Sequence, residues 1–155
     1  MNAQPSLFGD DPNFPIDNYR GAYWFLSNFS PSRILWRGKY WATIEHAFQA
    51  AKTDDEDWQE RIRTAKTPGE ANGLGKICPR RANWDAERVG IMRELLTIKF
   101  TDPSLRAKLL ATGSRPLIEG NTWGDRFWGV CKGTGENMLG QLQMKISDEI
   151  RADES

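Results

Sequence analysis

The sequence holds one histidine and two cysteines, and each of these low counts argues against one kind of structural site. A single histidine, His46, with no close cysteine–histidine pairs argues against a structural zinc site, and we expect no metal and no cofactor. Cys78 and Cys131 lie far apart in a chain without an export signal, which favours two free thiols over one buried disulfide.

Long apolar runs and an excess of one charge are also missing. No run approaches the roughly 20 residues that span a bilayer, and no basic region followed by an apolar one opens the chain. We therefore expect a cytoplasmic protein that does not contact a membrane. The 21 basic residues balance the 21 acidic ones, so contacts with nucleic acid must be local, and a nucleic-acid-binding structural protein is disfavoured.

What is present is typical of one folded domain: 155 residues, of which 39% are hydrophobic and 27% are charged. Prolines and acidic residues make residues 1–18 an extended lead-in, and residues 19–152 should form the domain. Seven tryptophans are many for this length. About half should stiffen the core, and the others are candidates to stack on a flat base.

The hydrophobic spacing predicts an α+β fold, a mainly helical compact single domain with a small β-sheet. Arg37-Gly38 should turn a hairpin between residues 33–36 and 39–41. Thr43 should cap a helix over residues 44–52. Further helices are expected over 54–66, from 68 to Gly73 or Gly75, from 83 or 84 to 100, over 103–111 and over 138–150, with a short strand over 115–119.

The helix that begins at residue 44 is the first candidate site. Its four- and seven-residue spacings place Glu45, Gln49 and Lys52 on one face. A carboxylate beside a lysine in a half-buried site can act as an acid or base with an amine partner. The alternative is a solvated stripe on a surface helix.

The segment from Glu119 to Gly129 is the second candidate, because it places carboxylates, an amide and two indoles between glycines. The alternative is a tight turn in which Asp125 pairs with a base. Two weaker signals are the glycine-flanked start of the last helix, over residues 133–137, which could hold phosphate, and a basic cluster. That cluster comprises Lys76, Arg80 and Arg81, which could equally be solvated surface.

Several short motifs follow one another in a fixed order over residues 20–150. They are Phe25-Leu26-Ser27-Asn28-Phe29-Ser30, Trp41-x-Thr43-x-Glu45-His46-x-Phe48-Gln49-Ala50-x-Lys52, Arg81-x-Asn83-Trp84, Lys99-Phe100, Trp123-Gly124-Asp125-x-x-Trp128-Gly129 and Gly135-x-Asn137-x-Leu139-Gly140. This ordered set resembles the signature of the NADAR domain family.

The resemblance implies a YbiA-like fold and N-glycosidase chemistry on exocyclic ribosylamines. One implied substrate is ADP-ribosylated guanine in a nucleotide or nucleic acid, with an ADP-ribosyltransferase toxin as a functional partner. The other is a ribosylamino-pyrimidine phosphate of riboflavin biosynthesis. A module that binds ADP-ribose or NAD without cleaving it is a further alternative.

The expected catalytic residues are Glu45, Lys52 and Asp125. Either Lys52 attacks the opened ribosylamine as a neutral amine and forms a Schiff base, or a carboxylate activates water directly. His46 should brace its helix. The expected substrate-binding residues are Phe25, Ser27, Asn28, Phe29, Trp84, Asn121, Trp123, Gly124, Trp128, Gly129 and Asn137.

Overall fold

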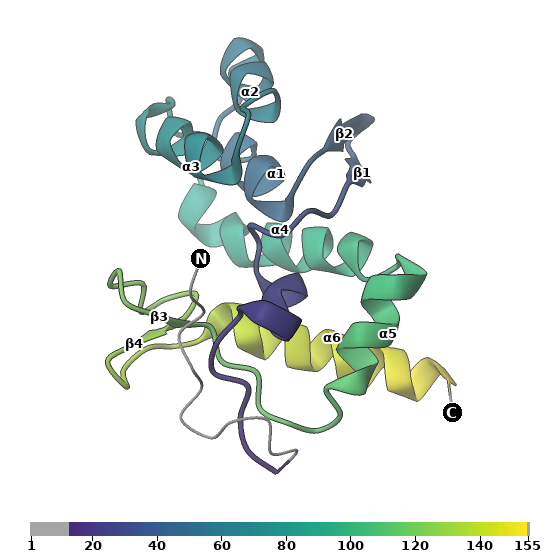
Figure 1. The fold of residues 1–155 in the computed structure, drawn as a ribbon. Helices are drawn as coiled ribbons and strands as arrows, with labels where there is room; N and C mark the ends of the chain where they lie inside the picture. Colours follow the sequence, from purple (N-terminus) through teal and green to yellow (C-terminus); the bar gives the residue numbers. More distant parts are fainter. Residues whose placement is uncertain (1–12, 155) are drawn as a thin grey trace. The chain divides into compact units, whose positions relative to one another are not determined.

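The computed structural model describes residues 13–154, which divide into two compact units. One unit comprises residues 28–102, and the other comprises residues 13–27 together with 103–154. Helices dominate both, and the described strands form two two-stranded sheets, so the predicted α+β class is confirmed (Figure 1). The extended N-terminal segment predicted over residues 1–18 lies largely outside the described residues.

The unit of residues 28–102 opens with a β-hairpin. Strands β1 (Ile34–Trp36) and β2 (Lys39–Trp41) pair antiparallel. Arg37 and Gly38 both have positive φ, at 51° and 78°, which is the backbone of the two-residue turn that suits hairpins. The hairpin predicted from Arg37-Gly38 is confirmed.

The rest of this unit is helical. Its helices are α1 (Ile44–Ala50), α2 (Glu56–Arg63), α3 (Pro68–Ile77) and α4 (Trp84–Lys99). The first of them lies at the centre of the unit, since α1 packs against α2, α3 and α4 (Figure 1). Thr43 caps α1 as predicted, because its hydroxyl accepts a hydrogen bond from the His46 N–H at 3.1 Å.

Several predicted helix ends in this unit are wrong. The first helix ends at Ala50, two residues earlier than expected, and α2 covers Glu56–Arg63 rather than residues 54–66. Helix α3 does not end at Gly73 or Gly75 but continues to Ile77. Glycine weakens an isolated helix, yet packing against neighbours overrides that local preference here.

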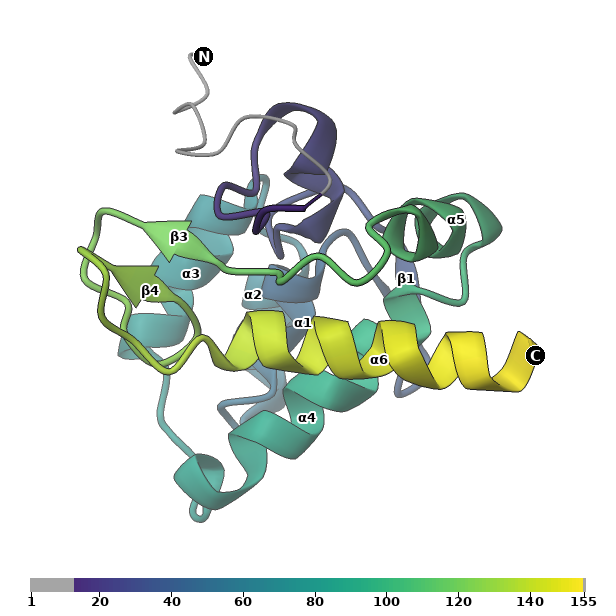
Figure 2. The same ribbon diagram turned by 90° about the horizontal axis from the view of Figure 1, so that it is seen from below.

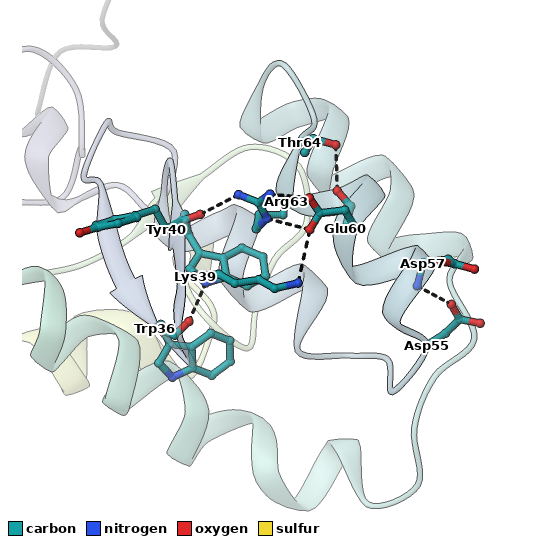
Figure 3. Close-up of polar contacts among 9 residues, drawn as sticks. Trp36, Lys39, Tyr40, Asp55, Asp57, Glu60, Arg63 and Thr64 are labelled. Atoms are coloured by element: carbon teal, nitrogen blue, oxygen red, sulfur yellow. Dashed lines mark hydrogen bonds and ion pairs between the residues drawn. The ribbon is translucent and has the colours of Figure 1, made fainter.

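Polar contacts tie the hairpin to α2 (Figure 3). Arg63 holds Glu60 through two hydrogen bonds, one of them 2.8 Å long from Nε, and its Nη1 also donates to the Tyr40 carbonyl oxygen. Lys39 adds a second cation 3.5 Å from Glu60. The Arg63 hydrogen bond is the main reason that the pKa of Glu60 falls to about 2.

The other unit is built around the longest helix of the described chain. Its elements are a 3₁₀ helix η1 (Gly21–Leu26), α5 (Pro103–Ala111), the parallel strands β3 (Gly120–Asn121) and β4 (Val130–Cys131), and α6 (Met138–Glu154). Helix α6 packs against α5, and β3 lies beside β4 (Figure 2).

The strand predicted over residues 115–119 is wrong. Only a single bridge joins Leu117 to Ile16, with the Ile16 N–H donating to the Pro116 carbonyl at 2.8 Å. The unit also contains a buried side-chain network, in which the Tyr19 hydroxyl donates to Gln143 Oε1 at 2.7 Å. Cys78 and Cys131, one in each unit, are both free, as expected.

Candidate active site

Helix α1 carries the first predicted catalytic carboxylate, and all of its seven residues are buried. Glu45 exposes 7% of its surface and Gln49 exposes 4%. The alternative of a solvated polar stripe is therefore wrong for these two side chains. A buried carboxylate needs hydrogen-bond donors, and the fold supplies them from two directions.

Glu45 is held by two amides. Gln49 Nε2, one turn further along α1, donates to Glu45 Oε1 at 2.6 Å, and Asn72 Nδ2 of α3 donates to the same oxygen at 3.1 Å. Among residues 13–154, no hydrogen bond reaches the other carboxylate oxygen, Oε2. The amides thus fix the carboxylate while leaving one oxygen able to accept or donate a proton.

His46 braces the start of α1, as predicted. Its Nε2 lies 3.0 Å from the Ala65 carbonyl oxygen, which can only accept, so Nε2 carries the proton. Nδ1 then accepts from the Thr43 hydroxyl at 2.8 Å. Nε2 thus holds α1 to the segment before α3, and Nδ1 holds the cap residue of α1.

Gly75 of α3 lets the backbone of that helix approach Gln49. A Cβ atom at residue 75 would lie 1.9 Å from Gln49 Oε1 and 2.7 Å from its Cδ. Only a residue without a side chain fits here without displacing the amide that holds Glu45. The glycine that local propensity marks as a helix end is therefore required for close packing.

Lys52 follows the end of α1 and is half-buried. Burial lowers the pKa of its ammonium, and the nearby Arg80 guanidinium lowers it further. Lys76 acts in the same direction, whereas Glu45 and the thiol of Cys78 oppose the shift. A lowered pKa raises the fraction of neutral amine, which is the form that attacks carbon.

Trp84 opens α4 and packs in the core, exposing only 3% of its surface. Its ring lies 5.1 Å from that of Phe48, and the Arg81 guanidinium lies over it at 5.3 Å. Phe48 and Arg81 thus already contact the buried indole, so we do not include Trp84 among the proposed base-stacking groups.

Asn28 joins the first motif to α1. Its main-chain carbonyl accepts the Glu45 N–H at 3.2 Å, and its side-chain amide donates to Met92 Sδ at 3.6 Å. Within the described chain its buried Oδ1 has no hydrogen-bond partner. The neighbouring Phe29 is exposed.

The remaining predicted residues belong to the other unit. Phe25 is buried in η1, and Ser27 ends that helix, its N–H donating to the Trp24 carbonyl at 2.9 Å. Asn121 and Asp125 form the centre of the second candidate segment. Asn121 Oδ1 accepts the Asp125 N–H at 3.0 Å, and Asn121 Nδ2 donates to the Asp125 carbonyl at 2.8 Å.

The Asp125 carboxylate is bonded to backbone rather than to a base. Its Oδ1 accepts the N–H groups of Phe127 and Trp128 at 3.1 and 2.9 Å. The alternative in which Asp125 pairs with a base in a tight turn is thus half right, because the turn exists and the described chain shows no such ion pair. Asp125 Oδ2 accepts no hydrogen bond from the described residues.

The indoles of this segment differ in exposure. Trp123 exposes 63% of its surface, whereas Trp128 is half-buried, with its ring 4.9 Å from that of Phe127. Gly124 has a φ of +89°, which favours glycine, and a Cβ at Gly129 would collide with Glu119. Trp123 is therefore the indole of the segment that is best able to meet a ligand.

Asn137 holds the start of α6 through its side chain. Its Oδ1 accepts the Glu119 N–H at 2.9 Å, and its Nδ2 donates to the Leu117 carbonyl at 2.8 Å. The first amides of α6 already bond to loop carbonyls, since Met138 N–H donates to Phe127 and Leu139 N–H donates to Trp128. These amides are not available to a phosphate in this arrangement.

Two residues that position Glu45 were not predicted as site residues from the sequence. Asn72 contacts Glu45 across 27 positions of sequence, and no local pattern marks it. Gly75 is marked only as a glycine, with nothing to show that its backbone meets Gln49. In the other unit, Glu119 Oε2 accepts from Asn121 Nδ2 at 3.1 Å, a contact that the short spacing of the two residues could have suggested.

The comparison with known proteins agrees with this arrangement of motifs. A model of the NADAR domain matches residues 16–151. The chain belongs to the NADAR domain family. One solved structure to which it is similar, the E. coli protein YbiA determined by NMR, aligns with a TM-score of 0.83 at 36% identity, covering 92% of this chain and 88% of that one. The predicted YbiA-like fold is confirmed.

Two curated relatives bear on activity. N-glycosidase Npun_R5314 of Nostoc punctiforme is 41% identical over 136 residues, an alignment that covers 83% of this chain and 86% of that protein. Riboflavin biosynthesis protein VVA0006 of Vibrio vulnificus is 36% identical over 131 residues, covering 82% of this chain but 35% of that protein. The chain is a hydrolase of the N-glycosidase class.

The described part of the chain contains neither a cluster of metal ligands nor a helix that could span a membrane. No group of three or more His, Cys, Asp or Glu side chains there could hold a metal ion. None of the helices over residues 13–154 has the length and apolar character that crossing a membrane requires.

Proposed function

We propose that this N-glycosidase hydrolyses the bond between ribose C1 and an exocyclic nitrogen of a base, with Lys52 as nucleophile and Glu45 as acid and base. One observation carries the proposal: α1 holds a buried carboxylate with one open oxygen, and the end of the same helix is followed by an amine on which that carboxylate acts and whose pKa is lowered. Such a pair suits a substrate whose nitrogen must gain a proton as its carbon is attacked.

The steps follow from the linkage. The lone pair of the exocyclic nitrogen opens the ring, so that the C1–O4 bond breaks, the proton of that nitrogen passes to O4 and C1 becomes an imine. The neutral Lys52 amine adds to C1, and its two protons pass in turn through Glu45 to the exocyclic nitrogen, so that the C1–N bond to the base breaks and a Lys52–C1 imine forms. The base leaves as an amine, water then adds to the Lys52–C1 imine, and Lys52 departs to release the sugar.

ADP-ribosylated guanine in a nucleotide or nucleic acid is the first proposed substrate, which would make the protein a reversal enzyme paired with an ADP-ribosyltransferase toxin. The exposed indole of Trp123 supports a large flat leaving group, because indoles stack on purines. Asp125 and Asn121 are proposed to contact the ribose hydroxyls, and Asp125 is the second proposed acid or base.

A ribosylamino-pyrimidine phosphate is the second proposed substrate. The observation in its favour is the similarity to the Vibrio vulnificus riboflavin biosynthesis protein over 82% of this chain. Both substrates share the ribosylamine bond, so the mechanism above applies to either one. They differ in the base that leaves and in what the ribose carries on C5′.

Turnover assays on both substrates, run side by side, test the proposed function. We expect release of the base from at least one of them, and release from neither would contradict the proposal. Calorimetry with ADP-ribose separates a hydrolase from a binding module, because tight binding without release at high protein concentration would favour the module.

The covalent step is tested by trapping. Borohydride should reduce the Lys52–C1 imine and leave the ribose attached to Lys52, as read by mass spectrometry of peptides. Lys52→Arg keeps the charge but cannot form the imine, so it should lose both the adduct and turnover. Lys39→Arg, on the exposed hairpin, is the matched control and should change neither. Near-normal turnover in Lys52→Arg would leave direct attack by water as the mechanism.

A further inference from the structure

Two basic side chains lie close to Lys52 without an acidic partner. Lys76 is in the last turn of α3, and Arg80 is in the short segment between α3 and α4. Both are exposed, and across residues 13–154 neither makes a side-chain hydrogen bond or an ion pair. Both act on the Lys52 ammonium as like charges.

The main chain fixes the place of these cations. The Arg81 N–H donates to the Lys52 carbonyl at 2.8 Å, and Arg81 Nε donates to the Ala51 carbonyl at 2.8 Å. The segment that carries Arg80 is therefore bonded to the end of α1. Helix α3, which carries Lys76, packs directly against α1.

Arg81, the third basic residue of this cluster, has a structural role. Besides its two bonds to the end of α1, its Nη1 pairs with Glu87 Oε2 at 2.7 Å, and its guanidinium lies over the Trp84 ring. Its main-chain N–H, its Nε and its Nη1 are all engaged in holding the fold. Lys76 and Arg80 have no comparable engagement, so the three bases of the cluster do not share one role.

The charges around Lys52 are unbalanced. Apart from Arg81, which Glu87 pairs, the cations near the end of α1 are Lys52, Lys76 and Arg80, and Glu45 is the carboxylate that raises the pKa of Lys52. Like charges held close together raise the free energy of the empty site, and a bound anion would offset that cost. Each proposed substrate carries such an anion, a phosphate group on C5′ of the ribose whose C1 is attacked, across a single furanose ring.

We propose that Lys76 and Arg80 bind the 5′-phosphate of the substrate's ribose and so hold C1 beside Lys52. This inference rests on the proposed function and names a binding site for the part of the substrate that does not react. The ligand is a phosphate ester of ribose. A monoester, as in ribose 5-phosphate, and a diphosphate, as in ADP-ribose, present the same group to the two cations.

Binding measurements test the site without any turnover. Calorimetry should compare ribose 5-phosphate, ADP-ribose and unphosphorylated ribose on the full chain and on Lys76→Gln, Arg80→Gln and the double variant. Each lost cation should weaken binding of the phosphorylated probes by about tenfold. Arg80→Lys should keep most of the affinity because it keeps the charge. Lys66→Gln, an exposed lysine that does not act on Lys52, should bind as the unmodified chain does.

The two phosphorylated probes distinguish the source of the phosphate. Stronger dependence of ADP-ribose binding on the two cations would assign the site to a diphosphate, and stronger dependence of ribose 5-phosphate binding would assign it to a monoester. Equal binding of both probes by the double variant and the unmodified chain would overturn the proposal. So would a loss of affinity that is the same for unphosphorylated ribose.

Kinetics separate this proposal from the proposed function. At a pH where Lys52 is neutral, the double variant should raise KM for a phosphorylated ribosylamine while kcat stays within about twofold, because a group remote from the reaction binds ground and transition states alike. Cation-dependent phosphate binding without base release would refute the proposed function alone. Turnover that is insensitive to both cations would refute the phosphate site alone.

Discussion

Gln49 Nε2 donates a 2.6 Å hydrogen bond to Glu45 Oε1, and the Gln49 side chain packs directly against the backbone of Gly75. One amide thus links the candidate acid–base group to the closest approach between α1 and α3. The position of the carboxylate depends on a glycine in a different helix.

Gly75→Ala should destabilise the fold and disturb Glu45 together. The new Cβ would lie 1.9 Å from Gln49 Oε1 and 3.0 Å from its Cβ, so Gln49 must shift. We expect a loss of about 1–3 kcal/mol in the free energy of unfolding, measured by urea denaturation, with a parallel fall in kcat.

Gly73→Ala is the matched control in the same helix. No atom lies within 4 Å of a Cβ at that position, and glycine inside a helix costs conformational entropy. This variant should gain about 0.5–1 kcal/mol and keep its activity. Equal effects of the two substitutions would show that α3 does not fix Gln49 in the way described.

Arg80→Gln should move the acid limb of the kcat/KM profile to higher pH. Arg80 lowers the pKa of Lys52, so its removal raises that pKa and reduces the neutral amine at a given pH. Activity near neutral pH should fall and recover as the pH rises. The position of the limb is the readout, because its height also reflects substrate binding.

The groups that act on Lys52 define the controls for that profile. Glu45 and Cys78 raise its pKa, whereas Lys76 lowers it. Lys76→Gln should therefore shift the limb in the same direction but less far. Arg33→Gln, whose guanidinium lies over Tyr40 on the hairpin, should leave the limb unchanged. A limb at the same pH in all variants would exclude Lys52 as the titrating group.

Lys99 should make the stability of the fold depend on pH. Burial lowers its pKa to about 7, and its Nζ donates to Ser30 Oγ at 3.3 Å. Between pH 7 and its ordinary pKa of 10.5, the unfolded chain holds a proton that the folded chain has released. Stability from this group therefore rises with pH across that window and is lowest below pH 7.

Denaturation of Lys99→Met beside the unmodified chain isolates this contribution. The difference in unfolding free energy should change by up to about 1.4 kcal/mol per pH unit between pH 7 and 10. Lys108→Met, an exposed lysine of α5, should show no such slope. Parallel stability curves for Lys99→Met and the unmodified chain would contradict a lowered pKa at Lys99.

Asp125 can be tested for chemistry separately from structure. Asparagine keeps the oxygen that accepts the Phe127 and Trp128 N–H groups, so Asp125→Asn should retain the turn and its stability. Asp125→Ala loses both acceptor contacts and should cost about 1–2 kcal/mol. If the carboxylate acts as an acid or base, both variants should lose about 100-fold or more in kcat. Full activity in Asp125→Asn would exclude that role, and Asp148→Asn on α6 serves as the surface control.

Local signals predicted much of the fold. The Arg37-Gly38 turn and the Thr43 cap each rest on the chemistry of one or two residues, and the structure contains both. The strand predicted over residues 115–119 does not form, because Leu117 joins Ile16 by a single bridge and not by a ladder of hydrogen bonds. The helix end predicted at Gly75 is wrong because a tertiary contact with Gln49 requires glycine at this position. A short stretch of sequence does not show such a contact.

In the candidate site too, contacts within one helix were predicted from the sequence and contacts between helices were not. The four-residue spacing of Glu45 and Gln49 predicted their contact, since helical geometry fixes it. The contact with Asn72 comes from a different helix, and no periodicity in the sequence reports it. Trp84 looked like a stacking group from composition, but the sequence does not show that Phe48 and Arg81 surround it.

The start of α6 has a consequence for motion. Four consecutive amides, from Glu136 to Leu139, donate to the carbonyls of residues 126–129. We expect these amides to exchange with solvent only when the loop and the first turn of the helix open together. Residues 126–129 of the tryptophan-rich segment are thus tied to the start of α6, although glycines flank them.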